Sequence, residues 1–221
     1  MNRLALFDCD GTMVDSAATI CAAMERAFVA HALPAPDRAE TRRIIGLSLV
    51  EAVAQLAPAH PDHVELADSY KRAFWALRQE GLVEEPLFDG VAHALAALEG
   101  DGWLLGVATG KSDRGLGLCL AGHGIRERFV TLQTADRHPS KPHPAMVLGA
   151  MAEAGAASET TVMIGDTSYD MQAAKAAGAA AIGVAWGCHP AEELLAAGAD
   201  AIVIDPAELP ALCAAYVRVT A

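Results

Sequence analysis

The chain begins, after three residues, with LALFDCDGTMVDS (residues 4–16). Its apolar run 4–7 predicts a short buried strand, because it is continuously hydrophobic and stops at turn-forming residues. Side chains alternate along a strand, so Asp8 and Asp10 leave it on the same side, and Gly11 permits a turn after them. A buried strand that carries two carboxylates to its carboxyl end is typical of the ligand-binding edge of an open α/β sheet.

A calcium loop fragment or an ordinary polar turn is the alternative explanation for these acids. A calcium loop needs acids at alternating positions and a bidentate glutamate near its twelfth residue. Asp10 is followed instead by Gly-Thr-Met-Val-Asp, with no acid two residues on. These residues alone leave the choice between a turn and a functional site open, and the partners found later in the chain favour a functional site.

The composition is that of a globular protein with a sizeable core. Hydrophobic residues make up 53% of the 221 residues and charged residues 20%, which does not fit a disordered chain. The formal net charge of −12 argues against nucleic acid or an anionic membrane as a partner. Acids interrupt the N-terminal region, unlike a signal peptide, and no apolar run approaches the roughly 20 residues that span a bilayer. With five widely spaced cysteines, we expect reduced thiols and a cytoplasmic protein.

Helix and strand patterns divide the chain into a core and an insert. Apolar spacing of three and four predicts helices over 17–33 (with Ser16 as N-cap), 37–45, 49–56 and 62–80, with no convincing strand among them. Beyond residue 90, strands over 103–108, 129–132, 161–164, 181–184 and 201–204 alternate with helices over 91–98, 112–121, 145–154, 171–177, 190–197 and 209–216. This alternation predicts an α/β fold, a doubly wound parallel sheet with helices on both faces. We expect a core domain of residues 1–15 and 88–221 and an inserted all-helical cap domain of residues 16–87.

Reactive side chains stand at the ends of three expected strands. Asp8 and Asp10 follow the first, Thr109 another and Asp166 a third, while Lys141 precedes a helix on the same side. The carboxyl ends of parallel strands share one edge of the sheet, so these side chains can converge. Mg²⁺ prefers carboxylates, water and a substrate phosphate as ligands, and lysine suits a phosphoryl oxygen. The sequence therefore predicts a site for magnesium and a phosphate group, with enough local positive charge to attract an anion to an acidic protein.

These motifs resemble, in order, those of the haloacid dehalogenase (HAD) superfamily, in its subfamily with a helical cap, and most of all those of the phosphoglycolate phosphatases. The first family motif, Asp-X-Asp-Gly-Thr, matches residues 8–12, and the second, an apolar strand ending in Thr or Ser, matches residues 107–109. The third, a lysine often followed by proline, matches Lys141, and the fourth, Gly-Asp-X-X-X-Asp, matches residues 165–170. Any one motif alone would be weak evidence, but the set spans the chain.

The resemblance implies a role for each matched residue. Asp8 is expected to be the nucleophile that forms an aspartyl-phosphate, and Asp10 the general acid and then the base. The implied residues are, as catalytic groups, Asp8, Asp10 and Lys141; as substrate-binding groups, Thr109, Gly110, Gly11 and Thr12; and as ligands of Mg²⁺, Asp8, Asp10 (through its backbone carbonyl), Asp166 and Asp170. Gly110 departs from the family pattern, since relatives often have Asn there.

The implied function is a Mg²⁺-dependent phosphatase for a small phosphorylated metabolite, with 2-phosphoglycolate as the leading candidate. A phosphosugar mutase shares all four motifs, and a non-catalytic phosphometabolite-binding protein can retain the fold, so both alternatives stay open. The cap is expected to read the substrate, and its loop 46–48 is our candidate for entering the site. Lys111 is either a solvated loop charge or part of the site's rim. The expected partner is a small-molecule phosphate ester, not nucleic acid or membrane, and the sequence gives no oligomeric state.

Overall fold

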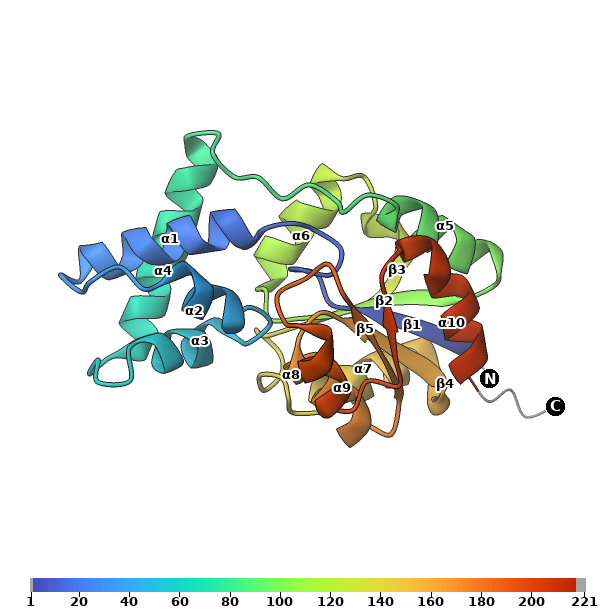
Figure 1. The fold of residues 1–221 in the computed structure, drawn as a ribbon. Helices are drawn as coiled ribbons and strands as arrows, with labels where there is room; N and C mark the ends of the chain where they lie inside the picture. Colours follow the sequence, from blue (N-terminus) through green and yellow to red (C-terminus); the bar gives the residue numbers. More distant parts are fainter. Residues whose placement is uncertain (1, 218–221) are drawn as a thin grey trace.

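A six-stranded parallel sheet forms the centre of the computed structural model, which describes residues 2–217 (Figure 1). Its strands follow the order β3-β2-β1-β4-β5-β6, and every neighbouring pair runs parallel. They are β1 (Asn2–Phe7), β2 (Leu104–Thr109), β3 (Phe129–Thr134), β4 (Ala156–Gly165), β5 (Ala180–Val184) and β6 (Ala201–Val203). The first predicted strand therefore lies inside the sheet, between β2 and β4.

Helices cover both faces of the sheet, as the predicted α/β fold requires. Side chains of β1 alternate between two apolar layers: Ala5 and Phe7 pack with α5, α6 and α10, whereas Leu4 and Leu6 pack with α7, α8 and α9. These helices are α5 (Val91–Gly100), α6 (Asp113–Gly122), α7 (Ala145–Ala154), α8 (Ser168–Ala176), α9 (Ala191–Ala196) and α10 (Leu209–Tyr216). The doubly wound architecture is confirmed.

Four helices between β1 and α5, which we call the insert, pack on one another beyond one end of the sheet (Figure 1). They share an apolar cluster that includes Met24, Phe28, Val53 and Leu66. The two connecting segments pair through a bridge between Val14 and Leu87. The insert consists of α1 (Ala17–Ala30), α2 (Arg38–Arg43), α3 (Leu49–Leu56) and α4 (His63–Gln79). The domain limits at residues 15/16 and 87/88 stay a prediction.

Some predicted element limits were wrong, each for a local reason. Helix α8 begins at Ser168 rather than at residue 171, because Thr167 and Asp170 form a reciprocal capping box. Ser16 precedes α1, but its hydroxyl caps nothing; it donates a hydrogen bond to Asp10 instead. Strand β4 also extends further toward the N-terminus than the predicted 161–164.

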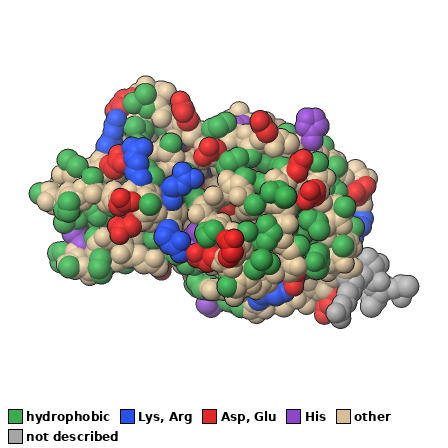
Figure 2. Space-filling view, in the orientation of Figure 1, with side chains coloured by type: hydrophobic (Ala, Val, Ile, Leu, Met, Phe, Trp, Pro, Cys, Tyr) green, Lys and Arg blue, Asp and Glu red, His purple; other side chains and the backbone are tan. Residues whose placement is uncertain are grey.

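The thiols are free, as the cysteine spacing predicts. All five cysteines lack a disulfide partner. No helix within residues 2–217 is both long enough and apolar enough to cross a membrane. On the face seen in Figure 2, acidic and basic side chains are interspersed with apolar ones.

Candidate active site

The predicted site residues of β1, β2 and β4 meet at the carboxyl edge of the sheet. Asp8, Thr109 and Asp166 are buried there, each at most 1% exposed. Gly11 makes the close approach possible: its φ is +81°, and a Cβ at this position would lie 2.2 Å from Asp166 Oδ2. Only glycine combines that backbone angle with that lack of bulk. The loop after β1 is therefore built to sit directly against the acid that follows β4.

Lys141 is buried between two of the acids. Its Nζ lies 3.0 Å from Asp8 Oδ1 and 2.6 Å from Asp170 Oδ1, and it donates a hydrogen bond of 3.2 Å to the carbonyl of Ala108. Burial opposes the charge on this ammonium, but the carboxylates of Asp170 and Asp8 outweigh burial and raise the pKa of Lys141. Lys141 is therefore a fixed cation beside Asp8, the predicted nucleophile.

Asp8 is the one acid of this group that keeps an oxygen free. Both of its carboxylate oxygens are buried without a directed hydrogen bond within residues 2–217, and only Oδ1 has the ion-pair contact with Lys141. Burial raises the pKa of Asp8 well above its ordinary value; Lys141 opposes this shift, and Asp170 and Asp166 add to it. A buried carboxylate oxygen without a partner is costly. The residue is therefore set up to meet a cation or to react.

The other two acids have most of their oxygens occupied. Asp166 accepts hydrogen bonds of 2.8 Å from the Thr12 hydroxyl and 2.8 Å from the backbone N–H of Cys188. Asp170 Oδ2 accepts from the hydroxyl and N–H of Thr167 at 2.6 and 3.1 Å, while its Oδ1 faces Lys141. Thr12, expected to contact substrate, thus holds Asp166 in place. Both oxygens of Asp170 are therefore engaged, one by Thr167 at the start of α8 and the other by Lys141.

Asp8, Asp166 and Asp170 together fit a divalent cation. Each offers one carboxylate oxygen, and these oxygens lie within 4.8 Å of one another. Three buried carboxylates beside one lysine leave an excess of negative charge, which a cation with oxygen preference would offset. The Asp10 side chain is not part of this cluster, and the expected role of its backbone carbonyl as a metal ligand stays a prediction.

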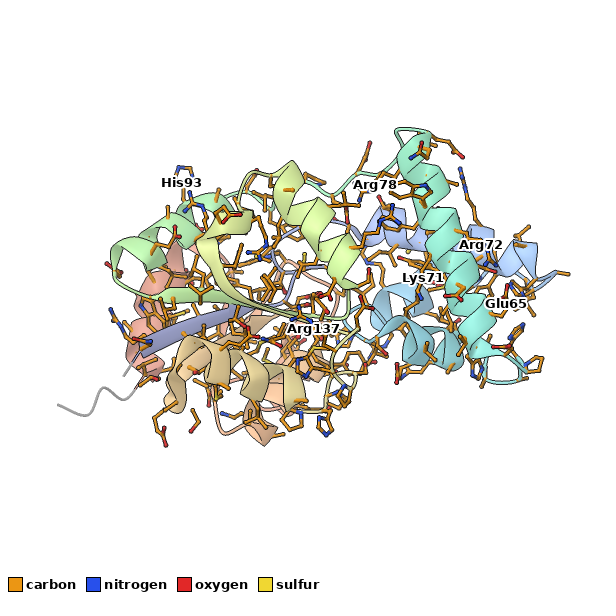
Figure 3. The ribbon with its side chains drawn as sticks, turned by 180° about the vertical axis from the view of Figure 1, so that it is seen from behind. Glu65, Lys71, Arg72, Arg78, His93 and Arg137 are labelled. Carbon is orange, nitrogen blue, oxygen red and sulfur yellow. The ribbon has the colours of Figure 1, made fainter. Side chains whose placement is uncertain are left out.

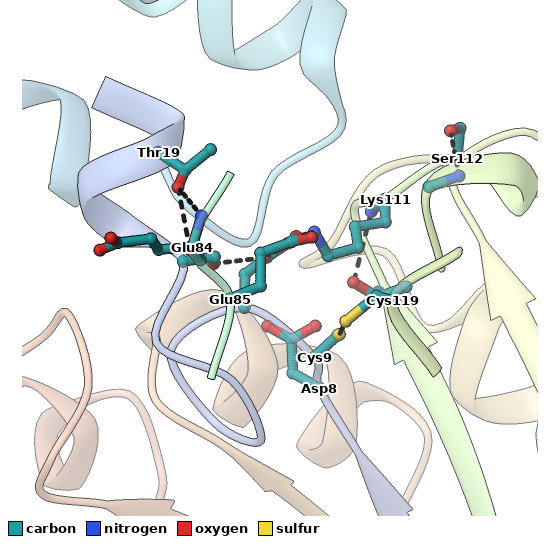
Figure 4. A network of polar contacts seen from close by, with 12 residues as sticks. Asp8, Cys9, Thr19, Glu84, Glu85, Lys111, Ser112 and Cys119 are labelled. Carbon is teal, nitrogen blue, oxygen red and sulfur yellow. Dashed lines mark hydrogen bonds and ion pairs between the residues drawn. The ribbon is translucent and has the colours of Figure 1, made fainter. Parts of the chain in front are cut away.

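Glu85 and Lys111 form a second, largely buried network (Figure 4), to which the Asp10 side chain also belongs. Lys111 Nζ lies 2.9 Å from Asp10 Oδ1 and 2.8 Å from Glu85 Oε1, and Glu85 also pairs with Arg78 of α4 at 2.8 Å. Burial opposes the charge on Lys111, but these carboxylates raise its pKa. Lys111 is thus a buried partner of the predicted general acid and no solvated loop charge.

The departure at Gly110 has a steric cause. A Cβ on Gly110 would lie 2.2 Å from the carbonyl oxygen of Leu47, in the loop between α2 and α3 of the insert. The same loop donates a hydrogen bond of 2.8 Å from the Ser48 N–H to the Ser140 hydroxyl of the core. The loop 46–48 therefore rests against the core beside the site. Thr109, just before Gly110, accepts a hydrogen bond of 3.3 Å from the Lys111 N–H.

Sequence reasoning missed Glu85 and gave no contacts for the loop of Trp186 and Gly187. Glu85 follows Glu84 in a segment without a motif. Its contacts with Lys111 and Arg78 arise only from the fold. Trp186 donates a hydrogen bond of 3.1 Å from Nε1 to the Thr12 carbonyl. A Cβ at the neighbouring Gly187 would lie 2.1 Å from Asp166 Cβ. Cys9 is buried in the apolar core, with its Sγ 4.0 Å from that of Cys119.

Comparison with known proteins identifies the family. Residues 5–184 match the family model of the haloacid dehalogenase-like hydrolases. The chain belongs to this family. It is 40% identical over 208 residues to a probable phosphatase, IndB, of Dickeya dadantii, covering 92% of this chain and 90% of that protein. The match to the family, together with the phosphatase relatives, makes the chain a phosphoric monoester hydrolase.

Relatives at lower identity have different substrates in their names. A phosphoglycolate phosphatase of Xanthomonas campestris is 31% identical, covering 94% of each chain. An N-acetylmuramic acid 6-phosphate phosphatase of Pseudomonas aeruginosa is also 31% identical, covering 94% of this chain and 92% of that protein. The solved structure of a hydrolase from Pseudomonas syringae, 24% identical, has a TM-score of 0.86 over 98% of this chain and 100% of its own. That structural similarity supports the α/β fold described above.

Proposed function

We propose that this HAD phosphatase is Mg²⁺-dependent and hydrolyses a small phosphorylated metabolite through an aspartyl-phosphate on Asp8. The observation that carries the proposal is the buried, unpartnered Oδ2 of Asp8 beside Lys141 and Asp166. An oxygen without a hydrogen bond is a free nucleophile. When bound by Asp8, Asp166, Asp170 and the Asp10 carbonyl, Mg²⁺ would neutralise charge on the phosphoryl oxygens and on Asp8.

The chain's own residues supply the proton transfers. In the first step Asp8 forms a bond to phosphorus, the bond from phosphorus to the leaving oxygen breaks, and Asp10 gives its proton to that oxygen. In the second step water attacks phosphorus, Asp10 takes a proton from the water, and the bond to Asp8 breaks to release phosphate. Lys141 and Thr109 would hold the phosphoryl oxygens through both steps.

The substrate stays open within this class. The resemblance points to 2-phosphoglycolate, but relatives named for phosphoglycolate and for N-acetylmuramic acid 6-phosphate are equally similar to this chain. Both names specify a phosphate monoester of an alcohol, so that class is our proposal. A cytoplasmic location, inferred from the free thiols, is part of it.

The test is phosphate release from p-nitrophenyl phosphate and a metabolite panel that includes 2-phosphoglycolate, with and without Mg²⁺. We expect hydrolysis only with the metal, abolished in Asp8→Asn. Asp10→Asn should lose about 10²–10⁴-fold in kcat with esters of aliphatic alcohols, because these need the general acid. Asp101→Asn, an exposed acid, serves as the matched control and should behave as wild type. Full activity of Asp8→Asn would rule out the nucleophile assignment.

A further inference from the structure

A cavity of about 650 Å³ lies between the insert and the core and opens onto the site. Asp10, Gly110 and Lys111 line its core side, and the loop 46–48 lines its insert side. Since Asp10 is the acid expected to protonate the leaving oxygen, the leaving group of the substrate must occupy this cavity. Its volume is in the range of pockets that enclose a whole drug-sized ligand.

The insert contributes apolar and aromatic side chains to this cavity. Ile20 and Met24 of α1 and Tyr70, Phe74 and Trp75 of α4 line it. Trp75 is a large aromatic side chain that remains 41% exposed, so its ring has surface still to bury. Aromatic rings on one wall of a pocket favour a planar or apolar occupant, because stacking and apolar burial both contribute to binding.

Two of the four cations around the cavity are held by largely buried acids. Lys71 and Arg78 project from α4 on the side of the core (Figure 3), where Arg78 lies 2.8 Å from Glu85. Lys111 is held by Asp10 and Glu85, as described above. Lys71 lies 2.9 Å from Asp68, but this pair is exposed at the surface and contributes little.

The fourth cation takes part in an aromatic contact between core and insert. The guanidinium carbon of Arg114, from the first turn of α6, lies 4.2 Å from the centre of the Trp75 ring, and Lys111 Nζ lies 5.8 Å from that of Phe74. Cation–π contacts of this kind hold an aromatic ring in one place. Arg114 therefore covers one face of Trp75, and the two cations fix the positions of both rings at the cavity.

We propose that the substrate is a phosphomonoester whose leaving alcohol carries a large ring system, which packs against Phe74 and Trp75. This inference rests on the proposed phosphatase function and narrows its substrate class. A glycolate leaving group offers one methylene and a carboxylate, so it would leave most of the cavity unfilled and make no contact between rings. Ring-bearing esters should accordingly be better substrates than 2-phosphoglycolate.

The experiment compares esters whose leaving alcohols have the same acidity and differ only in the distant group. Propyl phosphate, 3-phenylpropyl phosphate and 3-(2-naphthyl)propyl phosphate form such a series, with 2-phosphoglycolate beside them. We expect kcat/KM to rise by at least about tenfold from the propyl to the naphthyl ester, as an apolar pocket gains from added apolar groups. Propyl phosphate sets the baseline that needs no ring contact.

Variants test whether these two rings cause the preference. Trp75→Ala and Phe74→Leu should reduce the advantage of the naphthyl ester about tenfold and change propyl phosphate hydrolysis less than about twofold. Val64→Ala is the matched control, because Val64 is an exposed apolar residue of the same helix outside the cavity. Thermal melts show that each variant is folded, and Trp75, being partly exposed, tolerates truncation best.

The outcomes separate the two proposals. If no ester is hydrolysed with Mg²⁺, the proposed function fails, and calorimetric binding of propylphosphonate and 3-phenylpropylphosphonate still tests the cavity. Hydrolysis with no gain from the ring, or with 2-phosphoglycolate preferred, would overturn the substrate class alone. A loss in Trp75→Ala that is equal for all esters would overturn it as well, because the ring would then not be recognised at this wall.

Discussion

Replacing Asp166 by asparagine should make the metal-free protein more stable. The carboxyl group is fully buried, and burial, with Asp170 adding to it, raises the pKa of Asp166 from 3.8 to about 6. Hydrogen bonds from the Cys188 N–H and the Thr12 hydroxyl oppose that shift. At neutral pH the metal-free fold therefore holds an ionised acid in an environment that disfavours its charge.

The magnitude of this stabilisation and its dependence on pH follow from the pKa values of Asp166 in the unfolded and folded states. The rise from 3.8 to about 6 corresponds to about 3 kcal/mol at about 1.36 kcal/mol per unit. Between these pH values the folded protein binds more protons at Asp166 than the unfolded chain does, so metal-free stability falls as pH rises through the window. In Asp166→Asn the amide nitrogen cannot accept one of the two hydrogen bonds that Asp166 accepts from Thr12 and Cys188. We therefore expect the free energy of unfolding to rise by about 2 kcal/mol at pH 7. That gain raises Tm by about 4–8 °C in a chain of this length.

The assay is thermal unfolding in EDTA and in excess Mg²⁺, at pH 5 and pH 7. Wild type should gain about 2.7 kcal/mol from Mg²⁺ at a hundred times its Kd at pH 7, and less at pH 5, where protonation of Asp166 competes with the metal. Asp166→Asn should gain little at either pH, and Asp101→Asn should follow wild type. An Asp166→Asn protein that is less stable than wild type in EDTA at pH 7, or that keeps the full response to Mg²⁺, would refute the reasoning.

Two further substitutions probe the contact between core and insert. Gly110→Ala should lower kcat/KM at least about tenfold, because its Cβ would lie 2.2 Å from the Leu47 carbonyl oxygen. Gly117→Ala is the control, because a Cβ at this position in α6 would have no neighbour within 4 Å. It should leave activity unchanged and add up to about 1 kcal/mol of helix stability. Glu85→Ala should lower the free energy of urea unfolding by about 1.5–3 kcal/mol, since it removes the charge-assisted hydrogen bonds from Lys111 and Arg78 while Asp10 still faces Lys111. Equal effects of the two glycine substitutions, or a neutral Glu85→Ala, would contradict these assignments.

The sequence predicted the features that depend on local pattern. The apolar run before Asp8, the alternation of strands and helices after residue 90, and the convergence of Asp8, Lys141 and Asp166 all follow from periodicity and from the geometry of parallel sheets. The capping box of Thr167 and Asp170 was also readable, because a threonine with an acid three residues later is a helix-start signal. The two residues also belong to the Gly-Asp-X-X-X-Asp motif, so one segment carries both the helix start and the acids of the site.

Contacts between segments distant in sequence could not be predicted from the sequence. Nothing in the sequence around Glu85 indicates that it shares Lys111 with Asp10, since that contact depends on how the second connecting segment crosses the core. From the sequence, Gly110 is likewise only a departure from the family pattern, whereas the structure shows that a larger residue would collide with the insert. Both features depend on the distance between two packed units, which periodicity does not encode.

The two lysines divide the site's negative charge into two separately neutralised regions. Lys141 serves Asp8 and Asp170, and Lys111 serves Asp10 and Glu85. The second region is complete without a ligand, because both carboxylates already have a cation. The first is not, because three acids share one lysine there and Asp8 Oδ2 has no partner. An anionic phosphate would meet repulsion at Asp8 until a further cation is present, so the imbalance favours an order in which the metal binds first and the ester second.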